Sequence, residues 1–416
     1  MQMVTKGELL YTQATDKAVQ ERGETGGTVT ALLKYLLESH MVDAVYAMKK
    51  GADIYDAQPT LITDPKDVIQ TAGSLHCGTL LVPKQLSKTV LNADPNLKIA
   101  VVAKGCDTMA LYEMAKRGQI NLDNILMIGV NCGGTVRPAM ARKMIREKFG
   151  VNPDTVVKEE IDKGQFIILT ADGQHKGISI DELEEQGYGR RENCRRCKTK
   201  IPRQADLACG NWGIVGDKAG KATFVEVCSD KGAQALNKAV EAGVIEVSAA
   251  PQKGVEIRGK VEQAMLKLAD KWRAKDFAKG GNGTERLQAI MKETSRCIRC
   301  YACIENCPIC YCTECSTKKP YLVTPGEVPP NFMFHMIRFM HVSDSCINCG
   351  QCEELCPMDI ENSRLMHSIQ ADLEAMFGYK PGVDMTLPVL ALVKEPEERE
   401  RLAATGTDQI FNIFKD

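Results

Sequence analysis

Two cysteine motifs of identical spacing constrain this chain more than any other feature of its sequence. Residues 297–308 and 346–357 both read C-x2-C-x2-C-x3-C-P. In such a run, three thiolates of one motif and the remote fourth thiolate of the other hold each 4Fe–4S cluster. Zinc sites use two separated C-x2-C pairs, so two iron–sulfur clusters are favoured over zinc or free thiols. The expected ligands are Cys297, Cys300, Cys303 and Cys356 (the first set) and Cys346, Cys349, Cys352 and Cys307 (the second set).

Three more cysteines, Cys310, Cys312 and Cys315, follow the first motif closely. Their C-x-C-x2-C spacing fits no complete ligand set. Free cysteine is commonly buried, so packing around the clusters is the favoured interpretation. A further metal site is the alternative.

The composition favours a metal-binding protein of the cytoplasm. The chain has 18 cysteines in 416 residues, and a reducing cytosol disfavours a disulfide framework. A net charge of −1 creates no overall field that would attract nucleic acid. No apolar run is long enough to predict a membrane span, and the N-terminus lacks an apolar secretory core. The length predicts two or three domains.

The first part of the chain shows an α/β pattern. Apolar residues recur at helical spacing in 26–40, after Gly26 and Gly27. A glycine turn at a helix N-terminus suits a phosphate, although a plain helix cap explains it equally well. Residues 97–117 predict a strand, a turn and a helix, and 125–134 predict a strand followed by glycines.

Two cysteines follow these buried strands, Cys106 and Cys132. The carboxyl edge of such a sheet is where ligands bind, although two unrelated buried thiols are the alternative. Cys194 and Cys197 form a C-x2-C pair, and Cys106 and Cys132 would complete a four-thiolate group, the N-terminal set. The basic residues around the pair are Arg190, Arg191, Arg195, Arg196 and Lys198. They either offset the negative charge of a cluster, bind phosphate, or form a solvated face.

Further elements complete the predicted organisation. Strands are expected at 165–170, 176–180 and 222–228, and a helix near 233–242. The predicted fold is an α/β domain in the N-terminal part and an α+β ferredoxin-like two-cluster domain in the C-terminal part. The predicted divisions are 1–255, a helical linker at 256–294, the two-cluster segment at 295–362, and a helical tail at 363–416 with the charged run KEPEERER.

Catalytic residues are not identified by the sequence. The six histidines form no group with metal-ligand spacing, and no Ser–His–Asp or paired-carboxylate arrangement stands out. His76, beside Cys77, is the one histidine that merits attention.

Several short motifs occur together and in order: ETGGTVTALLKYLLE, TAGSLHCGTLL, VVAKGCDTMAL, IGVNCGG, CRRCK and ADLACGNWGIVGD. Over about residues 20–230 the chain resembles the coenzyme F420-dependent hydrogenase/dehydrogenase beta-subunit family. His76 and Cys77 lie in one of these motifs, and Cys77 is ranked as a spare thiol. One departure is Lys104-Gly105-Cys106-Asp107 in place of the usual Gly-Thr-Pro-Cys, which leaves the cysteine in place.

The resemblance implies that residues 1–255 bind FAD, coenzyme F420 and one 4Fe–4S cluster. The cluster ligands would be the N-terminal set, and the FAD pyrophosphate would lie near Gly26, Gly27 and Thr28. Iron–sulfur clusters pass single electrons, whereas coenzyme F420, a deazaflavin, accepts a hydride. A flavin is therefore needed between them.

The C-terminal two-cluster segment makes the chain most similar to the formate dehydrogenase branch of the family. That resemblance implies an electron-transfer subunit of methanogenesis. Electrons would pass from a catalytic alpha subunit through three 4Fe–4S clusters to FAD, and then as hydride to coenzyme F420. A heterodisulfide reductase-type flavoprotein complex is a further implied partner. The alternatives are a subunit of a hydrogenase or F420H2 dehydrogenase, or an iron–sulfur relay without flavin.

Overall fold

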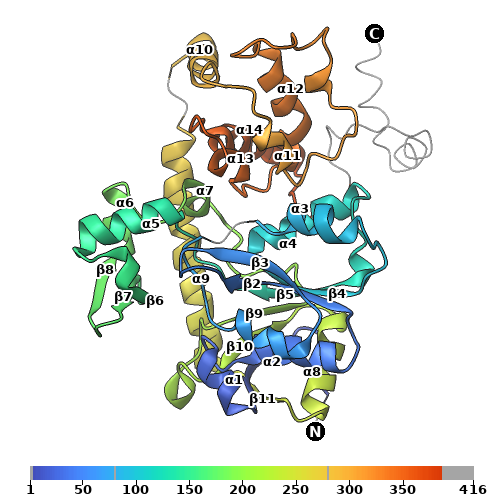
Figure 1. Ribbon diagram of the computed structural model, residues 1–416, viewed down its shortest axis with the longest axis vertical. Coiled ribbons are helices and arrows are strands. Elements are labelled where there is room, and N and C mark those ends of the chain that lie inside the picture. Colours follow the sequence, from blue (N-terminus) through green and yellow to red (C-terminus); the bar gives the residue numbers. More distant parts are fainter. Residues whose placement is uncertain (1–2, 79–80, 279–280, 387–416) are drawn as a thin grey trace. The chain divides into compact units, whose positions relative to one another are not determined.

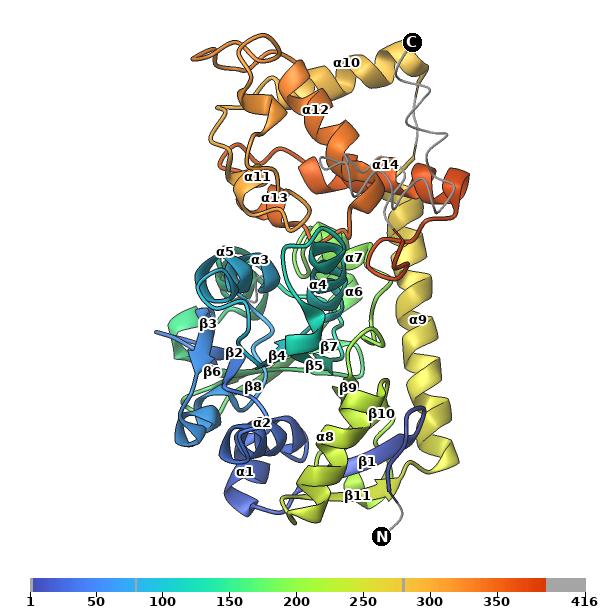
Figure 2. The ribbon, with the colours of Figure 1, turned by 90° about the vertical axis from the view of Figure 1, so that its right-hand side faces the viewer.

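A computed structural model describes residues 3–78, 81–278 and 281–386 (Figures 1 and 2). The chain divides into two compact units. Unit 1 comprises Met1–Thr108 and Ile120–Lys275. Unit 2 takes Met109–Gln119 together with the chain from Asp276 on. Helix α4 (Gly105–Lys116) is therefore divided between the two units after Thr108.

The described part of unit 1 is built on a sheet of eight strands in the order β11-β1-β10-β9-β5-β4-β2-β3 (Figure 1). The strands are β1 (Leu9–Ala14), β2 (Ala44–Lys50), β3 (Ala57–Ile62), β4 (Ile99–Ala103), β5 (Ile125–Val130), β9 (Leu207–Gly210), β10 (Thr223–Val227) and β11 (Ile245–Ala249). The central strands β2, β4, β5 and β9 run parallel, and the outer pairs are antiparallel. The α/β class predicted for the N-terminal part is confirmed.

The helices of this part of the chain are α1 (Lys17–Arg22), α2 (Thr28–Glu38), α3 (Pro83–Leu86), α4 (Gly105–Lys116), α5 (Pro138–Met144), α6 (Ile180–Glu185), α7 (Glu192–Arg195), α8 (Asp230–Glu241) and α9 (Gln252–Asp276). Helices α2 and α8 pack side by side against the sheet (Figure 2). Leu32, Leu33 and Leu36 of α2 are fully buried in the core between them, which confirms the amphipathic helix expected there.

A second sheet of three antiparallel strands carries its own core. Its strands are β6 (Val156–Asp162), β7 (Gln165–Thr170) and β8 (His175–Ser179). The pair β7 and β8 was expected from the sequence, and β6 was not. Met144, Phe149 and Leu183, from around α5 and α6, pack against Phe166 and Ile168 of β7.

Helix α9 extends unit 1 beyond the predicted boundary. A division near residue 255 falls inside this 25-residue helix, and unit 1 reaches Lys275. This part of α9 belongs to unit 1 because a narrow face of the helix is buried there. Ala269 and Trp272 are buried, and the Arg195 guanidinium lies 4.9 Å from the Trp272 ring centroid. Part of the glycine-rich break in the predicted linker, at 279–280, lies outside the described residues.

Unit 2 is helical in the part that the structure describes. Besides residues 109–116 of α4, its helices are α10 (Gly283–Thr294), α11 (Ala302–Glu305), α12 (Met333–Val342), α13 (Gln351–Glu354) and α14 (Asn362–Phe377). The predicted α+β class is wrong for these residues, which contain no strand. Between the two cysteine motifs the chain forms α12, whose Phe334, Ile337 and Phe339 fill the cores of the unit.

The helical stretch predicted for the tail corresponds to α14, whereas the KEPEERER run lies outside the described residues. Across the described ranges, no helix combines the length and the apolar character needed to cross a membrane.

Candidate iron–sulfur and flavin sites

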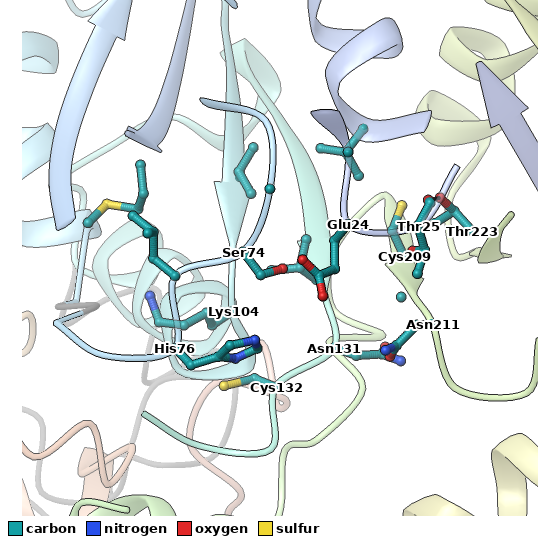
Figure 3. A pocket seen from close by; sticks show the side chains of 18 of the residues that line it. Glu24, Thr25, Ser74, His76, Lys104, Asn131, Cys132, Cys209, Asn211 and Thr223 are labelled. Carbon is teal, nitrogen blue, oxygen red and sulfur yellow. Dashed lines mark hydrogen bonds between the residues drawn. The ribbon is translucent and has the colours of Figure 1, made fainter. Parts of the chain in front are cut away.

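A cavity of about 300 Å³ opens at the carboxyl edge of the parallel strands in unit 1 (Figure 3). Its wall includes Lys104 after β4, Asn131 and Cys132 after β5, and residues 209–212 at the end of β9 and just beyond it. Helix α2 and the 71–76 loop close the other sides. This edge is where ligands bind in open α/β sheets, and the sequence predicted Cys132 there.

The N-terminus of α2 faces this cavity through Gly27 and Thr28. Gly27, the residue before the first turn, has φ 68° and offers no side-chain cap to the free N–H groups of the helix. Gly26 also has a positive φ, 69°, and packs against the backbone of Lys221 and Ala222. A Cβ on Gly27 would lie 2.6 Å from the Val19 carbonyl oxygen, so packing as well as backbone conformation requires glycine there.

A charged and polar group stands at one side of the cavity, where Figure 3 shows His76, Lys104 and Cys132 together. The backbone N–H groups of His76 and Cys77 donate to Glu159 Oε1 at 2.7 and 2.8 Å. Burial lowers the pKa of His76 to about 4, and its Nε2 has no partner among the described residues. Cys77 is buried in the core beside the second sheet.

The structure brings the four thiols of the N-terminal set together. Burial and the Asp107 carboxylate raise the pKa of Cys106, and the thiols of Cys132 and Cys197 raise it further. Burial raises the pKa of Cys132 to about 11, and the thiols of Cys194 and Cys197 also raise it. The four thiols therefore interact across a chain separation of some ninety residues.

The basic loop beside this set is not a solvated face, because its arginines are buried. Arg196 is 1% exposed and Arg190 is 5% exposed. Arg190 pairs with Glu184 and donates to the Gly133 carbonyl at 2.8 Å. Lys198 is the exposed member and pairs with Asp270.

Lys200 is a residue that sequence reasoning missed. It is 1% exposed, and its Nζ donates to the Cys194 carbonyl at 3.2 Å. Its charge lowers the pKa of Cys132 against the effect of burial. The signal in the sequence was its place three residues after the C-x2-C pair, inside a run of cations.

The two ferredoxin-type motifs of unit 2 fold alike. In the first loop Arg299 and Tyr301 have positive φ, and in the second loop Asn348 and Gly350 occupy the equivalent positions with positive φ. A short helix follows each time, α11 and then α13. The backbone of both loops thus adopts the left-handed conformation at the same two points.

The predicted first set lines one small cavity together with Phe334 and His335. Burial raises the pKa of Cys303; Arg338 lowers it, and the other three thiols of the set raise it. Cys300 is the exposed member, and the other three are partly buried.

The thiols of the predicted second set interact electrostatically. Burial raises the pKa of Cys352 well above its usual value; Arg338 opposes this, and the other three thiols of the set add to it. A hydrogen bond with Cys310 lowers the pKa of Cys307 to about 6 despite burial. The guanidinium of Arg338 interacts electrostatically with thiols of both sets.

Three further cysteines follow the first motif. Cys310 packs against the apolar clusters that contain Phe334 and Phe339, Cys315 Sγ lies 3.0 Å from Thr317 Oγ1, and Cys312 is partly buried. Within residues 3–78, 81–278 and 281–386, no three Cys, His, Asp or Glu side chains are close enough to hold a single metal ion. All 18 cysteines are free thiols.

An α/β unit with a ligand cavity and a four-thiol group, followed by a unit with two ferredoxin-type motifs, defines a class of iron–sulfur redox subunit. Family models match residues 9–87 and 96–253 as the N- and C-terminal parts of the coenzyme F420 hydrogenase/dehydrogenase beta subunit, and residues 296–361 as a 4Fe–4S dicluster domain. The chain belongs to the coenzyme F420 hydrogenase/dehydrogenase beta-subunit family, which confirms the resemblance seen in the sequence, and it carries iron–sulfur clusters.

Curated relatives match almost the whole chain. The chain is 49% identical over 379 residues to the F420-dependent formate dehydrogenase subunit beta of Methanocaldococcus jannaschii, covering 91% of this chain and 97% of the relative. It is 48% identical over 382 residues to the F420-dependent formate dehydrogenase 1 subunit beta of Methanococcus maripaludis, covering 92% and 97%.

More distant relatives match mainly the first part of the chain. The coenzyme F420 hydrogenase subunit beta of Methanococcus voltae is 27% identical over 236 residues, covering 56% of this chain and 81% of the relative. A chain of the F420-reducing [NiFe] hydrogenase complex from Methanosarcina barkeri shares the fold, with a TM-score of 0.56 at 19% identity, covering 66% of this chain and 95% of that chain.

Proposed function

We propose that this chain is the electron-transfer beta subunit of a formate dehydrogenase. It would pass electrons from a catalytic alpha subunit through 4Fe–4S clusters to FAD, and then as hydride to coenzyme F420. The observation that carries the proposal is the 48–49% identity to two F420-dependent formate dehydrogenase beta subunits, over 97% of each relative's length. The chain is thus an oxidoreductase subunit.

The three thiol sets are the proposed cluster ligands. A 4Fe–4S cube takes one thiolate at each iron, and each set supplies four thiols that are close enough to interact electrostatically. Buried cations accompany each group, Lys200 at the N-terminal set and Arg338 at the other two. This fits a cube that is net negative when four thiolates bind it.

The cavity of unit 1 is the proposed flavin site. The uncapped N-terminus of α2 offers N–H groups to a pyrophosphate. Apolar side chains of Leu33, Met48 and Val102 line the cavity and suit an aromatic ring system. Cys132 of the N-terminal set lines the same cavity. A bound flavin supplies the conversion between single electrons and hydride.

The residues of this chain would hold the reactants rather than transfer protons. Lys104 keeps its charge, because the Asp107 carboxylate and the Cys106 thiol outweigh burial and raise its pKa. It can therefore attract an anionic ligand at the cavity wall. His76, neutral near pH 7 at a pKa of about 4, can donate or accept one hydrogen bond there.

The proposal also includes partners and location. The relatives are named as subunits, and the catalytic alpha subunit of a formate dehydrogenase is the proposed electron donor. A heterodisulfide reductase-type flavoprotein complex is the proposed second partner. Eighteen thiols without a disulfide agree with a cytoplasmic location.

The test is a cofactor count on protein purified without oxygen. We expect about twelve irons, from three cubes of four, and one FAD per chain. Oxidised coenzyme F420 should be reduced when a chemical reductant is added. About eight irons without flavin would leave an iron–sulfur relay and contradict the proposal. Co-purification of a hydrogenase instead of a formate-oxidising subunit would assign the chain to the other branch.

A further inference from the structure

Arg338 is a buried cation in unit 2 that has no carboxylate partner in the described part of the chain. It lies on α12 and is 3% exposed. None of the residues that the structure describes offers it an ion pair with Asp or Glu. A buried charge is costly unless it is paired, so the compensating negative charge must come from another source.

The surroundings of Arg338 identify that source. One terminal nitrogen donates to the Cys303 carbonyl at 3.0 Å. The Nε and the other terminal nitrogen are buried and meet no acceptor in the described chain. Residues beside Arg338 on α12 contact both predicted sets: Phe334 and Ile337 pack with Cys297 and Cys303 of the first set, and Phe339 packs with Cys307 and Cys346 of the second set. The guanidinium therefore faces both predicted ligand sets at once.

The neighbourhood strengthens this interaction. Phe334, Ile337 and Phe339 of the same helix are buried and exclude water. Arginine keeps its proton in proteins, whereas both ring nitrogens of the buried His335 have no partner among the described residues. The positive charge on the buried face of α12 is thus that of Arg338, in surroundings where electrostatic interactions are stronger than in water.

We propose that Arg338 is a shared counter-ion of the two C-terminal 4Fe–4S clusters and raises the reduction potential of both. This inference rests on the proposed cluster ligands. Each reduction adds one electron, supplied by the formate-oxidising partner, to a cluster that is already negative. A buried cation favours the reduced form, and N–H donors to the cluster sulfurs act in the same direction. Arg338 keeps its proton throughout, and no bond to it forms or breaks.

A consequence is that the two clusters respond together to one side chain. Arg338 is a positioning and tuning residue, since it would act on the clusters without accepting electrons itself. Its removal should shift two potentials in the same direction, whereas a residue that belongs to one loop should shift one.

The test is a redox titration of the complete, cofactor-loaded complex, with the cluster signals followed by electron paramagnetic resonance. In Arg338→Gln we expect both C-terminal midpoint potentials to fall by at least 59 mV, a tenfold change in a one-electron equilibrium. Arg338→Lys keeps the charge and should shift each potential by less than half of that. Arg364→Gln is the matched control: this arginine of unit 2 is 37% exposed and paired with Glu361, and its loss should shift neither potential.

Three outcomes would overturn the inference. The first is that both potentials stay unchanged in Arg338→Gln at full iron content. The second is that only one potential shifts, which would exclude a shared role. If Arg338→Gln loses iron, Arg338→Lys decides. Full iron and near-normal potentials with lysine support the role of the charge, whereas iron loss in both variants assigns Arg338 to holding the Cys303 carbonyl. Two missing clusters in the unsubstituted protein would refute the proposed ligands instead.

Discussion

Single buried cations stand beside the thiols in both units. Lys200 donates to the carbonyl of Cys194, a proposed cluster ligand, and Arg338 donates to that of Cys303 in unit 2. A backbone carbonyl satisfies only part of such a charge, and under our proposal the thiolates of a cluster would supply the rest. The sequence showed a basic loop but not its burial. Burial depends on Glu184 and Trp272, which meet Arg190 and Arg195 only in the folded chain.

Cys194→Ser tests the N-terminal set. The change removes one thiolate of four, so we expect the loss of about a third of the iron, roughly four of twelve atoms. The signals of the two C-terminal clusters should remain. Iron and sulfide analysis with low-temperature spectra measures both. Cys228→Ser is the control, because this thiol lies outside the set and contacts the Glu226 carbonyl at 3.4 Å. Survival of all the cluster signals in Cys194→Ser would remove the set from the proposal.

His76→Gln should make folding less sensitive to acid. The folded-state pKa of His76 is about 4, against 6.5 unfolded, because the ring is buried. Between these values the unfolded chain binds the extra proton, so stability is lost as the pH falls through this window. Removing the ring should reduce the loss between pH 7 and pH 5 by at most about 2 kcal/mol. Urea unfolding at both pH values measures it, with His175→Gln on β8 as the exposed control. An equal slope in wild type and His76→Gln would contradict the assignment.

At the scale of elements, strands and helices with regular apolar patterns were predictable. Residues 99–103 and 125–130 are near-continuous apolar runs, and α2 has a clean apolar stripe. Strand β6 was missed because a register shift between Val156 and Lys158 breaks its alternation. A helical linker was predicted from residue 256, and α9 is helical there; few of its residues are buried, so its membership of unit 1 up to Lys275 left little signal in the sequence. The α+β expectation for unit 2 failed because the chain between the cysteine motifs forms a helix.

Gly27→Ala should reduce flavin content and stability together. The new Cβ would lie 2.6 Å from the Val19 carbonyl oxygen, so the start of α2 must shift away from its place at the cavity. We expect less flavin per chain after gel filtration and a lower melting temperature. Gly118→Ala is the matched control, with φ 65° and open space around the new methyl group. It should cost about 1–2 kcal/mol and leave the flavin in place. Equal flavin content in both variants would contradict the proposed placement of the flavin at α2.

At the scale of the whole molecule, the division into units does not follow the order of the chain. Most of α4 belongs to unit 2, although its first turn carries Cys106 of unit 1. Glu113 of α4 is fully buried and accepts hydrogen bonds from the Tyr379 hydroxyl at 2.9 Å and the Gly382 N–H at 2.7 Å. These partners lie more than 260 residues away. No local pattern reveals such a pairing, so the sequence predicted the helix but not its unit.

Glu113→Ala should destabilise unit 2 strongly. The carboxylate also pairs with the nearly buried Lys116 and Arg117, which would be left as uncompensated charges. Breaking such a buried pair typically costs about 3–5 kcal/mol. Loss of cluster absorbance in a denaturant titration under anaerobic conditions reports the change. Glu374→Ala on α14 removes only a hydrogen bond with Gln370 four residues away and should have a small effect. Similar midpoints for the two variants would argue against the buried network.

The exposure of Cys300 has a practical consequence for anyone who handles this protein. Its companions in the first set are partly buried, as are all the thiols of the second set. Dioxygen should therefore reach the first cluster before the second. Brief contact with air would remove iron unevenly, and an iron count taken afterwards would record the history of the sample rather than its number of sites.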